Sequence, residues 1–124
     1  MPNLRVKRIY EPKAVADGCR VLVDRIWPRG LTREAAAIDY WFKELGPSTA
    51  LRTWFGHRPE RWEEFARRYR AELKVAAAQP LLQELSALAA AGPLTLLYSA
   101  RDEEHNQAVV IAEVLRAKLG RQKR

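Results

Sequence analysis

Three short apolar runs divide the chain and predict the strands of a sheet. Residues 4–10 alternate loosely between apolar and polar positions, whereas residues 20–24 and 94–98 are almost continuously apolar. Runs of this length that stop at turn residues are typical of strands buried in a sheet. Pro12, Gly18 and Gly92 provide the breaks beside them.

Between these runs the apolar positions recur at spacings of three and four, which predicts helices. The clearest helix is expected over residues 59–78, where Trp62, Phe65, Tyr69 and Leu73 form one stripe. Residues 38–40 fit either a helix or a brief strand. Further helices are expected over residues 33–37, 48–55 and 80–92 and around residues 108–119, with Thr32, Ser48 and Asp102 as N-caps.

The order strand, strand, helices, strand, helix is typical of an α/β protein. We therefore predict a small, mostly parallel sheet flanked by helices, in a single domain over residues 1–119. Residues 120–124 read as a basic, disordered C-terminal tail. The link between the first two strands is shorter than a usual parallel crossover, so the residues leave their relative direction open.

Composition narrows the class of protein. No apolar run approaches the ~20 residues needed to cross a bilayer, so we expect a cytoplasmic protein without a membrane partner. Cys19 is the single cysteine, and His57 and His105 lie far apart in the sequence. We therefore expect no metal site and read Cys19 as a buried structural thiol. The glycines are scattered singly, which predicts neither a phosphate-cradling loop nor a dinucleotide cofactor.

Positive charge gathers in the first quarter of the chain. The formal net charge is +7, and residues 1–31 hold seven Lys or Arg against three Asp or Glu. Such an excess predicts an anionic partner. Non-specific nucleic-acid binding is one alternative, although no helix-turn-helix, RNA-binding or zinc-finger signature is present.

Charged residues follow two of the predicted strands directly. Because parallel strands place their carboxyl ends at one edge of a sheet, we expect the two following loops to meet there. Arginine forks and helix N-termini both suit a phosphate or a carboxylate, and the acids and the imidazole are candidates for acid–base chemistry. The candidates are Asp24, Asp102 and His105 as acid or base, with Arg25, Trp27, Arg29 and Asn106 for ligand binding.

Arg52 and His57 form a further cluster around the aromatic pair Trp54–Phe55. Large aromatic side chains in a short connection either pack in the core or wall a pocket. We take Arg52 and His57 as ligand-binding candidates.

Structural roles compete with each of these assignments. Arg25 can instead pair with Asp24, Asp39 or Asp102, and Trp27 can simply cap the core. Asp102 can serve the helix dipole alone. The order Ser99, Asp102, His105 is too local for a hydrolase triad. A non-catalytic interaction module therefore stays open beside an enzyme.

Four segments together resemble the YeaO-like proteins, the short branch of an uncharacterised bacterial family numbered four hundred and eighty-eight among the domains of unknown function. They are residues 7–10, 17–30, 48–57 and 96–106. The resemblance adds Lys7 and Arg8 to the ligand-binding candidates. Longer relatives carry Cys-His-Arg where this chain has residues 105–107, which argues against a cysteine-dependent reaction. They also have a helix between the first two strands, which favours a parallel sheet.

Overall fold

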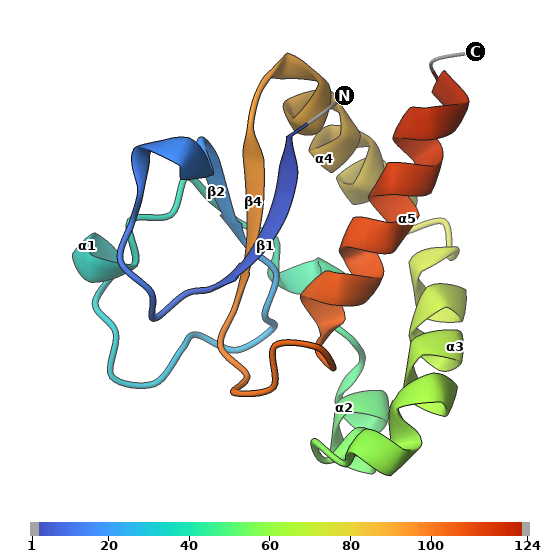
Figure 1. Cartoon of the computed structure of the whole chain (residues 1–124). Helices are drawn as coiled ribbons and strands as arrows, with labels where there is room; N and C mark the ends of the chain where they lie inside the picture. The colour runs from blue at the N-terminus through green and yellow to red at the C-terminus, as the bar shows by residue number, and fades with distance from the viewer. Residues whose placement is uncertain (1–2, 123–124) are drawn as a thin grey trace.

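A parallel sheet organises the molecule (Figure 1). The computed structural model describes residues 3–122, and within them the strands are β1 (Leu4–Arg8), β2 (Cys19–Leu22), β3 (Tyr40–Trp41) and β4 (Leu94–Tyr98). They lie in the order β1-β4-β2-β3, and every pair is parallel. The predicted α/β class is confirmed.

The short link between β1 and β2 joins two strands that are not neighbours in the sheet. Leu94 of β4 is opposite Leu4 of β1 on one side and Cys19 of β2 on the other. On its way from β1 to β2 the chain therefore crosses the end of β4, and this link contains the 3₁₀ turn η1 (Val15–Asp17). Gly18 follows at φ 63°, and an added Cβ there would lie 2.4 Å from the Pro93 carbonyl oxygen. Only glycine combines this backbone conformation with such a close approach.

Of residues 38–40, which fit either a helix or a strand from their sequence, only Tyr40 lies in a strand, β3, which ends at Trp41. β3 pairs with β2 through Val21 opposite Tyr40 and Leu22 opposite Trp41. Two residues are too few to show a period of their own. Pairing with β2 therefore decides their conformation.

Five α-helices lie among the described residues. They are α1 (Arg33–Ala36), α2 (Thr49–Phe55), α3 (Trp62–Leu73), α4 (Gln79–Ala91) and α5 (Gln107–Gln122), with 3₁₀ turns η2 (Lys43–Leu45) and η3 (Pro59–Arg61). Two predicted N-caps are confirmed. The hydroxyl oxygens of Thr32 and Ser48 accept the backbone N–H groups of Ala35 and Leu51, at 3.0 and 3.2 Å.

The predicted helix over residues 59–78 is too long at both ends. Residues 59–61 form the 3₁₀ turn η3, and α3 stops at Leu73, whose carbonyl accepts the Gln79 side-chain amide at 2.8 Å. The apolar stripe also ends at Leu73, because the following residues are mainly alanines with little area to bury. At the other end of the chain, α5 continues to Gln122, past the predicted boundary at residue 119. The rest of the predicted tail, residues 123–124, lies outside the described residues.

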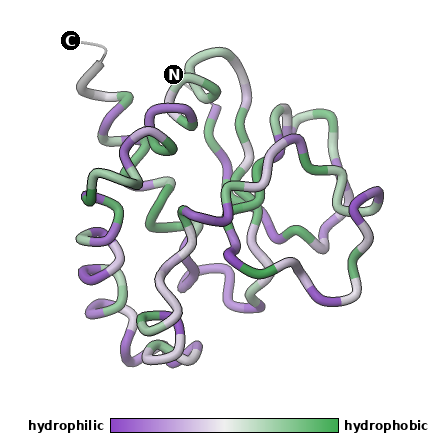
Figure 2. The backbone as a smooth tube through the Cα atoms, turned by 180° about the vertical axis from the view of Figure 1, so that it is seen from behind, coloured by the Kyte–Doolittle hydropathy of each residue, from purple (hydrophilic) through white to green (hydrophobic). Residues whose placement is uncertain are grey.

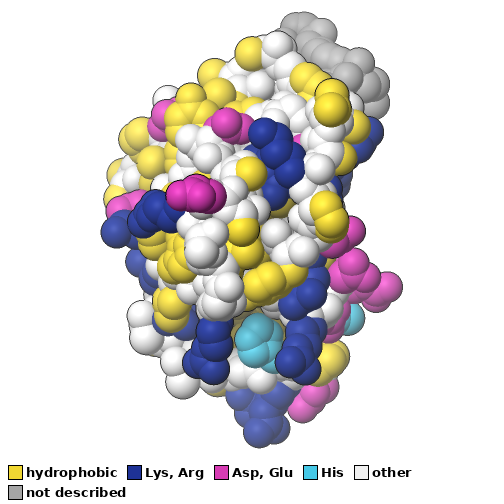
Figure 3. All heavy atoms as spheres, turned by 90° about the vertical axis from the view of Figure 1, so that its left-hand side faces the viewer, with side chains coloured by type: hydrophobic (Ala, Val, Ile, Leu, Met, Phe, Trp, Pro, Cys, Tyr) yellow, Lys and Arg dark blue, Asp and Glu magenta, His cyan; other side chains and the backbone are white. Residues whose placement is uncertain are grey.

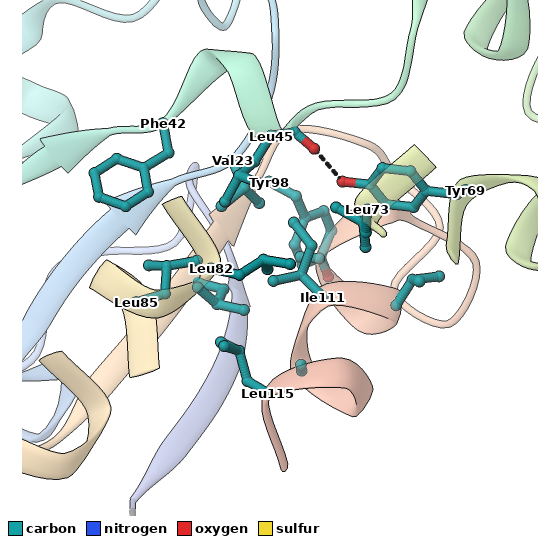
Figure 4. Close-up of a cluster of buried hydrophobic side chains, with 14 of the residues drawn as sticks. Val23, Phe42, Leu45, Tyr69, Leu73, Leu82, Leu85, Tyr98, Ile111 and Leu115 are labelled. Atoms are coloured by element: carbon teal, nitrogen blue, oxygen red, sulfur yellow. Dashed lines mark hydrogen bonds between the residues drawn. The ribbon is translucent and has the colours of Figure 1, made fainter. Parts of the chain in front are cut away.

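The two faces of the sheet carry unequal cores. The larger core fills the space between the sheet and helices α2 to α5, where the Tyr69 hydroxyl donates to the Leu45 carbonyl (Figure 4). A smaller cluster on the other face contains Ile9, Leu22, Ala36 and Leu97. Hydropathy along the backbone follows this arrangement, with apolar strands at the centre and alternating polar and apolar segments along α3 (Figure 2). Within residues 3–122 no helix is long and apolar enough to cross a membrane.

Candidate functional site

The carboxyl ends of three strands open into one cleft. Arg8 ends β1, Asp24 follows β2 and Ser99 follows β4, and all three line a cleft of about 1240 Å³. Segments from α2 and the start of α5 complete its walls. Ten of the eleven predicted site residues lie on this cleft: Arg8, Asp24, Arg25, Trp27, Arg29, Arg52, His57, Asp102, His105 and Asn106.

Lys7 is the predicted residue that the structure places elsewhere. Side chains alternate along a strand, so Lys7 and Arg8 leave β1 on opposite faces of the sheet. The Lys7 ammonium donates to Asp17 at 3.0 Å and to the Pro12 carbonyl at 2.8 Å. Lys7 therefore does not line the cleft, and its ligand-binding role stays a prediction from the resemblance.

Asp17 is also the partner of Arg20, and this ion pair is buried. Arg20 Nη1 donates to Asp17 Oδ2 at 2.6 Å, and the two side chains are 1% and 3% exposed. Burial alone raises the pKa of Asp17, but the Ala14 N–H, Lys7 and Arg20 together bring it down to about 2. Arg20 also donates to the carbonyls of Ala36 and Ala37. This group is a structural feature, and none of its residues lines the cleft.

Asp24 joins β2 to the loop after β4. Its Oδ2 accepts the backbone N–H of Ser99 at 3.0 Å and the Ser99 hydroxyl at 2.5 Å, and its Oδ1 accepts the Gln107 amide. Burial raises the pKa of Asp24, while the bonds from Ser99 and Gln107 and the charge of His57 oppose the rise. Both carboxylate oxygens are therefore already engaged.

Two arginines bind backbone carbonyls rather than carboxylates. Arg8 donates from Nε to Ala100 at 2.9 Å and from Nη2 to Ser99 at 3.2 Å. Arg25 donates from Nε and Nη2 to the carbonyls of residues 47 and 46, at 3.0 and 2.7 Å. The carboxylates proposed from sequence as Arg25 partners, at residues 24, 39 and 102, are not among its contacts.

Trp27 has a structural role as well as a place on the cleft. Its Nε1–H donates to the Leu31 carbonyl at 2.6 Å, and its ring meets Trp41 edge to face at 5.3 Å between centroids. It packs against the smaller core cluster, as the alternative interpretation proposed.

Asp102, His105 and Asn106 form an ordered turn before α5. Asp102 Oδ1 accepts the N–H groups of Glu104 and His105, and His105 Nδ1 lies 2.8 Å from Asp102 Oδ2. A carboxylate oxygen only accepts, so Nδ1 carries the proton in this pair. The bond from His105 holds the pKa of Asp102 below its usual value. Asp102 was predicted as the helix N-cap, but Asn106 Oδ1 holds that position by accepting the Val109 N–H at 3.2 Å.

The remaining predicted residues make fewer side-chain contacts within the described residues. Arg29 and His57 are exposed, and His57 adopts φ 58° just after α2. Arg52 is half-buried, and its Nε has no hydrogen-bond partner among the described residues. Tyr10 and Ile26 also line the cleft and were not predicted as site residues. The rule that found Asp24 applies to both, because each follows the end of a strand.

Positive charge dominates the cleft. Five arginines line it against two carboxylates, and within residues 3–122 no guanidinium group of the five lies within 4.0 Å of a carboxylate oxygen. Figure 3 shows a histidine side chain with basic side chains on both sides in the lower part of one face. The arginines are Arg8, Arg25, Arg29, Arg52 and Arg101, and the carboxylates are Asp24 and Asp102.

Metal ligands are not gathered in the same way. Among the described residues no three His, Cys, Asp or Glu side chains lie close enough together to hold a metal ion. Cys19 begins β2, at the end of the strand opposite Asp24.

Fold and site together define a small parallel α/β protein with arginines at the carboxyl edge of its sheet. The chain belongs to the DUF488 family: a family model described as "Inactive DUF488-N3 subclade" matches residues 3–124. It is 43% identical to the uncharacterized protein YeaO of Escherichia coli (strain K12), over 93% of this chain and 98% of YeaO. The uncharacterized protein Rv3073c of Mycobacterium tuberculosis (strain ATCC 25618 / H37Rv) is 41% identical over 91% of this chain and 93% of its own.

The predicted resemblance to YeaO-like proteins is thereby confirmed. No solved structure matches the chain.

Proposed function

We propose that the cleft binds a small anionic molecule, through a carboxylate or phosphate group, without performing chemistry on it. The observation that carries the proposal is the set of five arginines that line one cleft and whose guanidinium groups form no ion pair with a carboxylate within residues 3–122. Like charges repel in a confined space, and a cleft with low-dielectric walls focuses the field on its opening. An anion bound there relieves that repulsion and accepts charge-assisted hydrogen bonds.

The two carboxylates of the cleft already accept hydrogen bonds from the protein, which agrees with binding without turnover. Asp24 already accepts hydrogen bonds at both oxygens, and Asp102 accepts the two N–H groups and the imidazole described above. The family model that matches this chain is described as inactive, which supports the same conclusion. Residues 105–107 also lack the cysteine that the longer relatives carry.

Calorimetric titration with inorganic phosphate and with acetate, at low ionic strength, tests the proposal. Arg29→Ala and Arg101→Ala each remove an exposed cleft arginine that makes no side-chain hydrogen bond within residues 3–122. We expect each variant to weaken binding by roughly ten- to a hundredfold, since a hydrogen bond to a charged group contributes about 1.5–3 kcal/mol.

Arg5→Ala is the matched control. It removes the same charge from the first half of β1, where Arg5 is exposed and donates only to Asn3 within the described residues. We expect its affinity to equal that of the wild type. Equal losses in all three variants would point to the net charge alone, as in non-specific nucleic-acid binding, and would contradict the proposal. Absence of binding by either anion would contradict it too.

A further inference from the structure

We infer that the bound molecule is an organic anion whose charged group is attached to a flat apolar ring. The inference rests on the proposed function and adds the chemistry of the ligand body. It comes from the walls of the cleft, whereas the proposed function comes from the arginines.

The size of the cleft already exceeds what a lone ion needs. Its volume is about 1240 Å³, and pockets that enclose whole small molecules usually measure about 300–1,000 Å³. A phosphate or carboxylate alone would occupy a small part of it. The remaining volume has room for a body of several carbon atoms.

Apolar side chains offer a surface for that body. Tyr10 and Ile26 line the cleft although they are 40% and 59% exposed, and they are two of the five large hydrophobic residues left exposed in the part of the chain that the structure describes. Exposed apolar area of this kind marks binding surfaces when it gathers around one opening. Phe55 and Phe65 lie deeper, with their rings stacked at 4.4 Å between centroids.

The aromatic walls are held in position before any ligand arrives. The Tyr10 hydroxyl donates to the Arg29 carbonyl at 2.8 Å, and the Arg8 guanidinium lies 4.9 Å from the Tyr10 ring centroid. Trp27 is fixed through its bond to the Leu31 carbonyl. Fixed walls lower the ordering cost of binding, and flat rings gain most from contact with another flat ring. A cation beside an aromatic wall suits a ligand whose charge lies next to its ring.

Matched pairs of probes separate the ring from the charged group. Phenyl phosphate is compared with methyl phosphate, benzoate with acetate, and phenol serves as the neutral ring. We expect the ring compound to bind about tenfold more tightly than its methyl partner in at least one pair, because burying an aromatic face removes apolar area from water. The pair with the larger difference in affinity shows whether the charged group of the ligand is a phosphate or a carboxylate.

Ile26→Ser tests where the ring lies, and Val75→Ser is its control. Val75 is similarly exposed, at 54%, and lies in the turn between α3 and α4, away from the cleft. We expect Ile26→Ser to reduce the ratio between the affinities for the ring compound and for its methyl partner at least threefold. Val75→Ser keeps the full preference.

The outcomes distinguish the two proposals. Equal affinity of ring and methyl compounds would overturn this inference and leave the anion site standing. Phenol binding as tightly as the phenyl anions, or no binding by any anion, would overturn the proposed function and this inference with it. Equal loss of ring preference in both serine variants would overturn the placement of the ring on Ile26.

Discussion

Arg8 and Arg25 are held in position in the same way. In each side chain, two guanidinium nitrogens donate to the carbonyls of two consecutive residues in a neighbouring loop. A carbonyl carries no net charge, so the bonds fix the side chain and leave its positive charge uncancelled. The alternatives of a structural and a ligand-binding arginine therefore do not exclude each other here.

This arrangement predicts a moderate stability loss for Arg25→Ala. Gly46 and Pro47 are buried, and the substitution leaves both of their carbonyls without the Arg25 donor, which costs about 1–3 kcal/mol. The loss is smaller than the 3–5 kcal/mol expected for a broken buried ion pair. Urea unfolding without added anions measures it, with Arg29→Ala as a control expected within about 0.5 kcal/mol of the wild type. Equal stability of the two variants would contradict the carbonyl role.

Asp17 provides a prediction about acid stability. Its pKa is about 2 in the folded protein against 3.8 as the ordinary value. Because the folded value is the lower one, its contribution of about 2–3 kcal/mol is present above pH 4 and is lost as the pH falls toward 2. Asp17→Asn removes it, so we expect a large deficit in unfolding free energy at pH 7.

The deficit of Asp17→Asn relative to the wild type shrinks as the pH is lowered from 4 toward 2, where the wild-type carboxyl is itself protonated. Chemical unfolding at a series of pH values gives the comparison. A deficit that stays constant down to pH 3 would show that Asp17 does not titrate as described.

At the scale of elements, the loop before α5 depends on two consecutive side-chain caps. The Asp102 carboxylate accepts hydrogen bonds from the N–H groups of the turn. Asn106 accepts the Val109 N–H, and its own amide donates to the Asp102 carbonyl at 2.9 Å. Asn106 is 2% exposed, so water does not replace these bonds. The position of His105 in the cleft thus follows from how α5 begins.

Asn106→Ala is expected to destabilise the protein by about 1–2 kcal/mol, because it removes an N-cap from the longest helix. Asn106→Asp retains the accepting oxygen and favours the helix dipole, so it should recover most of the loss despite the missing amide donor. Thermal unfolding of both variants gives the comparison. A loss of equal size in both would assign the effect to the amide donor rather than to the cap.

Elements with a clear hydrophobic pattern were predictable, and those fixed by distant partners were not. The strands around residues 20 and 94 could be located because their apolar residues form nearly continuous runs that end at turn residues. The stripe of α3 could be located because its apolar residues recur every three or four positions. The end of α3, the two-residue β3 and the cap at Asn106 depend on contacts made after folding. A sequence pattern does not contain those contacts.

At the scale of the whole molecule, the site was predictable from one rule about direction. Parallel strands share a carboxyl edge, so residues after β2 and β4 had to meet, and Arg8 joins them as the last residue of β1. The rule does not give side-chain partners. Lys7 lies outside the cleft because adjacent strand residues face opposite sides of the sheet, and the contacts of Arg25 join segments more than twenty residues apart.

The order of the strands also has a consequence for how the protein is made. β4 is the last strand to leave the ribosome, yet it separates β1 from β2 and pairs with both. While residues 9–93 are being synthesised, β1 has none of its described strand partners, and its backbone N–H and C=O groups stay unpaired. Such segments are where nascent chains aggregate or recruit chaperones. The sheet therefore closes in one late step, and the cleft at its carboxyl edge comes into existence only with that step.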